Sequence, residues 1–279
     1  MVDLLGQSAV LEPAESLEVH GNLLMALQYH DPTNPFRMQC SARLVELLQD
    51  KNIALEQKGY AAGMAINYLV EDERNELRDV ISSVRPLLEK AAPQSIGDLY
   101  LWYYYTLYCQ AVGDFASARH YIDQVAFVAD KLGTRRMAIV SRWFQHINCI
   151  QERDVAGLEA IRERILPKGD EGKAIHLCVF HSVTASILVL RGDTTSAVQH
   201  LEAWRRAAHA YRLQLHEASA LVAMAAIHFE QGALDQTAAV VEEGRRFTAN
   251  SSMVSEYLEL TMIGALVSAA LNRDEQART

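Results

Sequence analysis

The chain has 279 residues, of which 50% are hydrophobic and 22% are charged, and it contains only 6 prolines. This composition predicts a folded, mainly helical protein with enough apolar residues for a core, and excludes a disordered or collagen-like chain. The formal net charge of −9 argues against a nucleic-acid surface, because phosphate binding requires a basic stripe that releases counterions.

The N-terminal residues lack the features of a targeting segment. They contain no basic stretch followed by an apolar core, and no stretch of the chain reaches the roughly 20 apolar residues of a membrane helix. Four cysteines, Cys40, Cys109, Cys149 and Cys178, lie far apart in helical patterns, which predicts reduced thiols rather than a disulfide framework. We therefore expect a cytoplasmic protein that has no membrane partner.

Four helices are predicted in the first part of the chain. Apolar spacing and stop signals place them at residues 13–30, 36–50, 55–70 and 75–91. The second is expected to carry an apolar face of Cys40, Leu44, Leu47 and Leu48. Pro86 falls inside the fourth and predicts a kink or break there.

A turn recurs about every 40 residues from the middle of the chain onward. The predicted turns lie at Gly113-Asp114, Arg153-Asp154, Gly192-Asp193, Gly232-Ala233 and Asn272-Arg273. Each closes one apolar helical pattern and opens another, and such helical pairs must stack to bury their apolar faces. The sequence therefore predicts a single all-α domain, a right-handed superhelical solenoid of antiparallel helix pairs. Residues 1–53 would form divergent N-terminal helices and residues 54–279 the repeats, the last of them incomplete.

The unit at residues 96–133 resembles a tetratricopeptide repeat. Trp102, Gly113, Asp114, Phe115 and Ala118 stand at the relative spacings of that family's pattern. In the pattern a bulky residue opens the first helix, a Gly-Asp-aromatic turn follows, and a small residue lets the second helix approach.

Other positions depart from that pattern. Thr106 stands where the family favours a small residue, Arg153 replaces a turn glycine, and Leu158 replaces a small contact residue. The period also exceeds the family's usual length of about 34 residues. With these departures the chain is similar to the tetratricopeptide-like superhelices of MalT-type and other large LuxR-type or STAND-ATPase bacterial transcriptional regulators. There the superhelix is a sensor and interaction module, while nucleotide and DNA binding reside in other domains.

The resemblance implies a set of positions that face the concave groove of the superhelix. These are Tyr100, Tyr103, Gln110, Trp143, Ser182, Ser186 and Phe229. Tyrosine and tryptophan suit an adaptable binding surface, because they offer a large contact area and a polar group at low entropic cost. The alternative is that these aromatic residues fill the spaces between long helices.

The sequence contains none of the common catalytic motifs. It lacks a phosphate-binding loop, a dinucleotide-binding glycine motif, a nucleophile elbow and an HExxH zinc motif. The glycine-lysine cluster at residues 167–173 is expected to be a loop between helices. One alternative is zinc, held by two i, i+3 pairs on neighbouring units; these are His146 with Cys149 and Cys178 with His181. The alternative is that the two cysteines are small core residues and the two histidines are capped or partly exposed.

Three hypotheses for function follow. The main one is a non-enzymatic interaction or sensor module of a bacterial transcriptional or signalling regulator. It would bind a protein, a peptide or a small effector in its groove, need no cofactor, and dock on other domains of the regulator. The first alternative is a stand-alone peptide sensor or adaptor, and the second is a metal-binding helical enzyme.

Overall fold

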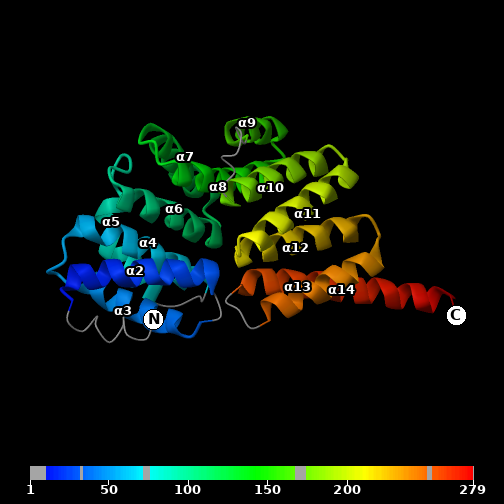
Figure 1. Cartoon of the computed structure of the whole chain (residues 1–279), viewed down its shortest axis with the longest axis horizontal. Helices are drawn as coiled ribbons and strands as arrows, with labels where there is room; N and C mark the ends of the chain where they lie inside the picture. The colour runs from blue at the N-terminus through cyan, green and yellow to red at the C-terminus, as the bar shows by residue number, and fades with distance from the viewer. Residues whose placement is uncertain (1–10, 32–33, 72–75, 167–173, 250–252, 279) are drawn as a thin grey trace. The chain divides into compact units, whose positions relative to one another are not determined.

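Helices make up the regular structure of this protein. A computed structural model describes residues 11–31, 34–71, 76–166, 174–249 and 253–278, and these residues form thirteen helices and no strand (Figure 1). The prediction of an all-α protein is confirmed. The helices group into two compact units, Met1–Gln145 and His146–Thr279, which we call unit 1 and unit 2.

The described part of unit 1 contains six complete helices and the first part of a seventh. They are α2 (Pro13–His30), α3 (Phe36–Gln49), α4 (Leu55–Glu71), α5 (Glu76–Leu88), α6 (Ile96–Ala111), α7 (Phe115–Lys131) and α8 (Arg135–Glu152). The predicted positions of the first four helices are confirmed to within three residues. The apolar face predicted for α3 is buried. Helix α5 is not broken at Pro86 and continues to Leu88; the proline, which has no N–H group, costs the helix one hydrogen bond to the carbonyl group four residues back.

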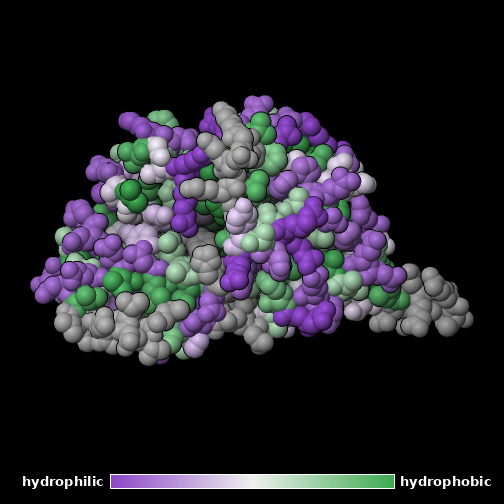
Figure 2. Space-filling view, viewed as in Figure 1, coloured by the Kyte–Doolittle hydropathy of each residue, from purple (hydrophilic) through white to green (hydrophobic). Residues whose placement is uncertain are grey.

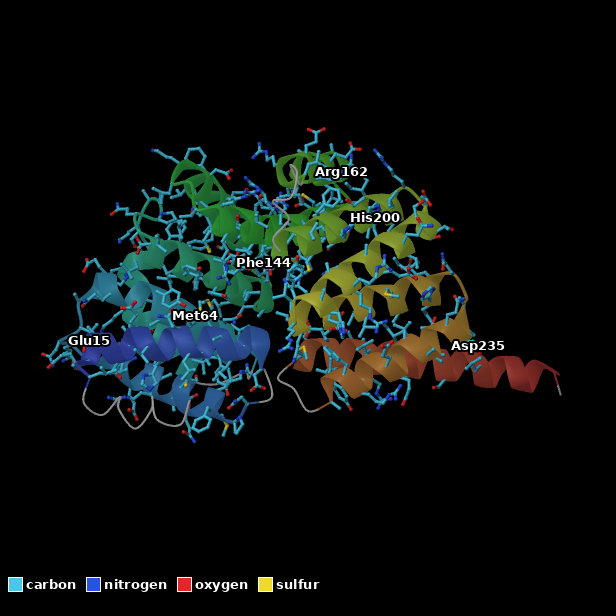
Figure 3. All side chains as sticks on the ribbon, in the orientation of Figure 1. Glu15, Met64, Phe144, Arg162, His200 and Asp235 are labelled. Carbon is cyan, nitrogen blue, oxygen red and sulfur yellow. The ribbon has the colours of Figure 1, made fainter. Side chains whose placement is uncertain are left out.

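The helices of unit 1 pack both on their neighbours in sequence and on alternate helices. Helix α4 contacts α2, α3, α5 and α6, so the even-numbered helices α2, α4 and α6 lie side by side (Figure 1). Met64 of α4, labelled in Figure 3, is buried in this packing. This arrangement buries the apolar face of each helix on two sides, which a lone helical hairpin could not do.

Glycines allow α4 and α6 to approach closely. A Cβ atom at Gly63 would lie 2.9 Å from the carbonyl oxygen of Tyr100 and 3.2 Å from Cα of Leu101. A Cβ atom at Gly59 would lie 3.0 Å from the carbonyl carbon of Gly97. Since these contacts are with backbone atoms, no change of side-chain rotamer could relieve them. The α4–α6 interface is therefore one of backbone against backbone.

In unit 2 the described residues form the end of α8 and six further helices. They are α9 (Val155–Ile165), α10 (Ala174–Leu190), α11 (Thr194–Ala210), α12 (Gln214–Glu230), α13 (Leu234–Thr248) and α14 (Val254–Arg278). Each helix from α9 to α13 packs on the next, and α12 also packs on α14. The contact between α12, α13 and α14 is formed by aliphatic side chains: Val222 and Ala225 of α12, Val240 and Val241 of α13, and Leu260 and Ile263 of α14.

Among the described residues, one turn geometry recurs at the ends of six helices. The residues with positive φ are Gly113, Gly133, Arg153, Gly192, Arg212 and Gly232, with φ between 55° and 81°. In each turn the following N–H donates to the carbonyl oxygen five residues back, as from Asp114 to Cys109 at 2.8 Å and from Ala233 to His228 at 2.9 Å. This is the long hydrogen bond of a Schellman motif, which satisfies carbonyl groups at a helix end.

Aspartates in three of these turns cap the next helix. Asp114, Asp154 and Asp193 accept hydrogen bonds from backbone N–H groups three residues later, at 3.1, 2.9 and 3.0 Å. Hydrogen bonds from Ser117 lower the pKa of Asp114, and hydrogen bonds from Ser196 lower that of Asp193 in the same way. The four predicted turns from Gly113 to Gly232 thus share a structural cause, a left-handed residue followed by the start of a new helix.

The fifth predicted turn is wrong. Helix α14 runs without interruption through Asn272 and Arg273 to Arg278. Neither residue is a glycine, and continuing the helix satisfies the backbone groups without a left-handed residue. The predicted loop at residues 167–173 lies outside the described residues. In the part of the chain that the structure describes, no helix combines the length and apolar character needed to cross a membrane.

Candidate functional site

Four side chains from three successive even-numbered helices form a patch on unit 1. They are Asn22 and Met25 of α2, Tyr60 of α4 and Tyr100 of α6, and we call this patch the tyrosine face. The hydroxyl group of Tyr60 donates to Oδ1 of Asn22 at 3.0 Å and lies 3.4 Å from Sδ of Met25. The rings of Tyr60 and Tyr100 meet edge to face, with centroids 5.0 Å apart and an interplanar angle of 88°. The patch is therefore continuous across the three helices.

Two glycines set the geometry of the tyrosine face. A Cβ atom at Gly21 of α2 would lie 3.2 Å from Cε1 of Tyr60, so the missing side chain makes room for the ring. Gly63 of α4 brings α6 close, which places the Tyr100 ring against that of Tyr60. Local helix packing thus fixes both aromatic rings in position.

The tyrosine face has the chemistry of a binding surface. Asn22 is exposed, and Met25, Tyr60 and Tyr100 are half-buried. None of the four side chains is charged at neutral pH, so the patch offers apolar area together with amide and hydroxyl groups. Methionine adds a flexible, polarisable surface that adapts to different ligands. The four residues include neither a general base nor an activated nucleophile.

The other predicted groove residues of unit 1 lie apart from this patch. Tyr103 is only 6% exposed, and its ring packs edge to face on Tyr104 and on Phe144 of α8, with centroids 4.8 and 4.9 Å away. Tyr103 therefore fills space between helices. Gln110 and Trp143 are half-buried. Of the four groove residues predicted in unit 1, Tyr100 is the one that belongs to the tyrosine face.

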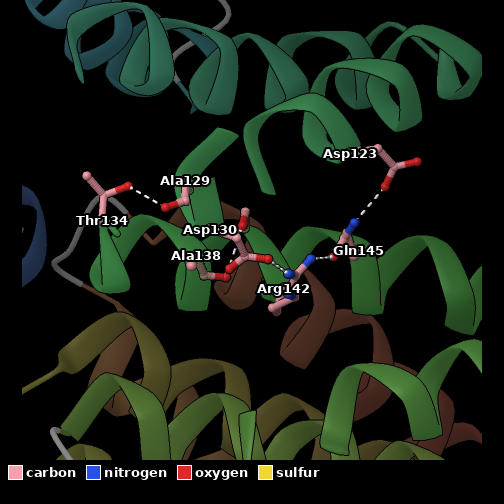
Figure 4. Close-up of polar contacts among 8 residues, drawn as sticks. Asp123, Ala129, Asp130, Thr134, Ala138, Arg142 and Gln145 are labelled. Atoms are coloured by element: carbon pink, nitrogen blue, oxygen red, sulfur yellow. Dashed lines mark hydrogen bonds and ion pairs between the residues drawn. The ribbon is translucent and has the colours of Figure 1, made fainter. Parts of the chain in front are cut away.

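Polar contacts connect the N-terminal part of α8 to α7. Arg142, whose side chain is buried, forms an ion pair with Asp130, and it also donates to Oε1 of Gln145 at 2.6 Å (Figure 4). Gln145 in turn donates to Asp123 at 2.6 Å. A largely buried guanidinium group must be paired, because an unpaired charge there would be costly. This network fixes the helix that carries Trp143.

In unit 2 the structure brings two predicted groove residues together. Ser186 Oγ donates to the carbonyl oxygen of Ser182 at 3.1 Å and lies 2.8 Å from Nε2 of His146. Ser182 is only 3% exposed, which leaves it little surface for a ligand. The third predicted residue, Phe229, is half-buried near the end of α12.

The residues of the zinc hypothesis do not converge. His146 contacts Ser186, whereas His181 contacts His200 of α11. Burial raises the pKa of the Cys178 thiol to about 12 and keeps it protonated. Among the described residues, no group of three or more His, Cys, Asp or Glu side chains could hold a metal ion. The geometry gives the metal-enzyme hypothesis no support.

His181 and His200 instead form a neutral pair between α10 and α11. Their Nδ1 atoms are 3.0 Å apart. Burial, together with the smaller effects of the charges of His200 and Arg206, lowers the pKa of His181 to about 4. Burial also lowers the pKa of His200, and the positive charge of Arg162 contributes to this shift. His200 and Arg162 are labelled in Figure 3. At neutral pH one ring donates its N–H to the other, as in a packed polar contact.

The sequence analysis missed Asn22, Met25 and Tyr60. A signal for Tyr60 was present, because it lies one period before Tyr100. Residues about one period apart meet repeatedly on successive even-numbered helices: Asn22 with Tyr60 and His146 with Ser186 are separated by 38 and 40 positions. Extending each predicted groove position by one period would therefore have found the second tyrosine.

The comparisons with known proteins add no relative to this picture. No protein-family model and no curated protein matches the chain. The candidate site therefore depends on the geometry of the chain itself.

Proposed function

We propose that this protein is a non-enzymatic helical-repeat module that binds a peptide, a protein segment or a small effector on its even-numbered helices. The observation that supports this most directly is the tyrosine face, where Tyr60 and Tyr100 stand one period apart and meet edge to face. Partly exposed tyrosines held by packing are well suited to recognition, because little side-chain entropy is lost when a ligand binds.

The proposed mechanism is coupling between neighbouring units. A ligand on the tyrosine face would touch α2, α4 and α6 at once, and would favour the spacing of these helices that gives the best contacts. In a stacked array a small change in spacing at one interface alters the curvature of the whole array. The ligand binds the two curvatures with different free energies. This difference limits how far the ligand can shift the population from one curvature to the other.

The wider setting is part of the same proposal. Repeated Schellman turns and aspartate caps support a tetratricopeptide-like superhelix. We place this right-handed solenoid in the cytoplasm, as the sensor and interaction region of a MalT-like bacterial transcriptional regulator. Other domains of that regulator would then carry the nucleotide and DNA sites and would read out the change in curvature.

Two measurements on the full chain test whether it binds such ligands. Native mass spectrometry of gently purified protein should reveal a discrete adduct if the ligand is a small effector. Selection from a phage-displayed library of random 12-residue peptides should enrich a common aromatic or apolar motif if the ligand is a peptide. A spectrum without an adduct, together with a selection that enriches no motif, would contradict the proposed binding function.

A further inference from the structure

Helix α14 of unit 2 is apolar on two sides. Leu260 and Val267 are buried on the side that faces the unit. On another side, Leu258, Met262 and Leu266 are 54%, 66% and 52% exposed. Their spacing of four residues places them in one row along the helix, and we call this row the outer stripe.

A row of this kind differs from ordinary surface hydrophobicity. On the face seen in Figure 2, hydrophobic residues are interspersed with hydrophilic ones. Isolated apolar residues on a surface need no explanation, whereas contiguous apolar rows mark contacts with another molecule. We therefore expect another molecule to cover the outer stripe.

The repeat indicates what kind of surface the outer stripe is. Helices α12 and α14 begin one period apart, at Gln214 and Val254. In this register Ala220 and Ile227 of α12 correspond to Leu260 and Val267 of α14, and all four are buried. The two helices therefore use equivalent positions to face their unit.

The outer stripe corresponds to the side of α12 that α14 covers. In the same register Val222 corresponds to Met262 and Ala225 to Ala265. Val222 and Ala225 pack with Leu260 of α14. Helix α14 thus presents to solvent the side by which α12 receives a helix, and within the described residues this side remains exposed.

We propose that a second copy of this chain covers the outer stripe, through antiparallel packing of two α14 helices about a two-fold axis near Met262. A two-fold interface uses the same patch twice, so the patch must complement itself. About this axis Leu258 would meet Leu266 of the second copy, and Glu259 would meet Ala265 of the second copy. Large apolar residues then face each other, and the carboxylate of Glu259 faces no other carboxylate.

Charge predicts how this dimer responds to salt. Each chain carries a formal net charge of −9, so two copies repel each other at long range, and salt screens this repulsion. Dimerisation through an apolar stripe should therefore strengthen with added salt, whereas association through ion pairs would weaken. The contact is one helix long and so smaller than a standard stable interface, which predicts weak dimerisation that depends on protein concentration.

Sedimentation equilibrium of the full chain tests the proposal, over protein concentrations from about 1 to 100 µM. The key variant is Met262→Glu, and the control is Phe127→Glu on α7, since both original side chains are 66% exposed. We expect the wild-type chain and the control to dimerise alike, and the dissociation constant of Met262→Glu to rise at least about tenfold, which corresponds to about 1.4 kcal/mol. Leu258→Lys is a second variant in case Met262→Glu unfolds.

Other outcomes would overturn the second-copy proposal. They are a wild-type chain that stays monomeric at the highest concentration, and a dimer that neither variant weakens.

Discussion

Two interfaces between even-numbered helices are packed in different ways. Between α4 and α6 in unit 1, glycines bring backbone against backbone, and a Cβ atom at Gly63 would lie 2.9 Å from a carbonyl oxygen. Between α12 and α14 in unit 2, aliphatic side chains such as Val222 and Leu260 fill the space. The difference teaches that the repeat does not prescribe the interface: the recurring turns set the period, and each helix pair then packs in its own way.

The largest expected change in stability comes from adding one methyl group at a glycine between α4 and α6. Gly63→Ala should lower the free energy of unfolding by about 3 kcal/mol, because backbone atoms of α6 must move. Gly264→Ala on α14 is the matched control. Its new Cβ would lie 3.0 Å from Cγ1 of Val241, a side chain that can adjust. The control should change stability by less than about 0.5 kcal/mol, since the gain in helix propensity offsets the contact. Urea denaturation measures both. Equal losses would show that the side chains packed on α14 give way no more easily than the backbone of α6.

Acid should weaken unit 2 through a buried histidine of α12. Burial lowers the pKa of His216 to about 4 from its ordinary 6.5. Above pH 6.5 the ring is neutral in both the folded and the unfolded chain. Between pH 6.5 and 4 mainly the unfolded chain takes up the proton, so stability should fall, by about 3 kcal/mol at pH 4.

The pH test needs a reference variant, because burial raises the pKa of Glu256 and stabilises the fold in acid. The difference between the wild-type chain and His216→Gln isolates the histidine contribution. Denaturation at pH 7, 5.5 and 4 gives the free energy of unfolding of each protein. The two values should converge as the pH falls. If the difference in free energy of unfolding between the two proteins is the same at all three pH values, burial does not lower the pKa of His216.

The smallest effect concerns the turns, which both units share. Arg153 has φ of 56° at a position where four of the other five turns of this geometry have glycine. Arg153→Gly should raise the free energy of unfolding by about 1 kcal/mol, because the left-handed conformation is costly for a residue with a side chain. Gly192→Ala should lower it by a similar amount, since nothing else lies near its Cβ position. Thermal unfolding measures both changes, and a stabilising Gly192→Ala would refute the shared geometry.

The sequence predicted the parts of the fold that depend on local rules. Helix starts and stops and the turns at Gly113, Gly192 and Gly232 follow from short-range backbone chemistry. Arg153 was correctly placed in a turn, whereas Asn272 was not. Both sites lack glycine, so the pattern alone could not distinguish a strained turn from a continuous helix.

The candidate site was less predictable, because it depends on contacts between distant helices. Tyr100 was predicted from its place in the repeat, but Tyr103 was expected to face the groove and is buried. The close approach of α4, which Gly59 and Gly63 allow, and the ring of Phe144 leave α6 a narrow exposed side. None of these three residues lies on α6, so the pattern of that helix could not reveal how much of it is covered.

The most direct test of the account is the affinity of a selected peptide or retained effector for variants of the tyrosine face. Isothermal titration should show binding to Tyr100→Ala weakened at least about tenfold. Tyr60→Phe, which loses only the hydroxyl group that reaches Asn22, should bind a few-fold less tightly. The control Tyr211→Ala removes an exposed tyrosine of unit 2 and should bind like the wild-type chain. If Tyr100→Ala keeps its melting temperature and binds the ligand with unchanged affinity, the tyrosine face is not the binding site.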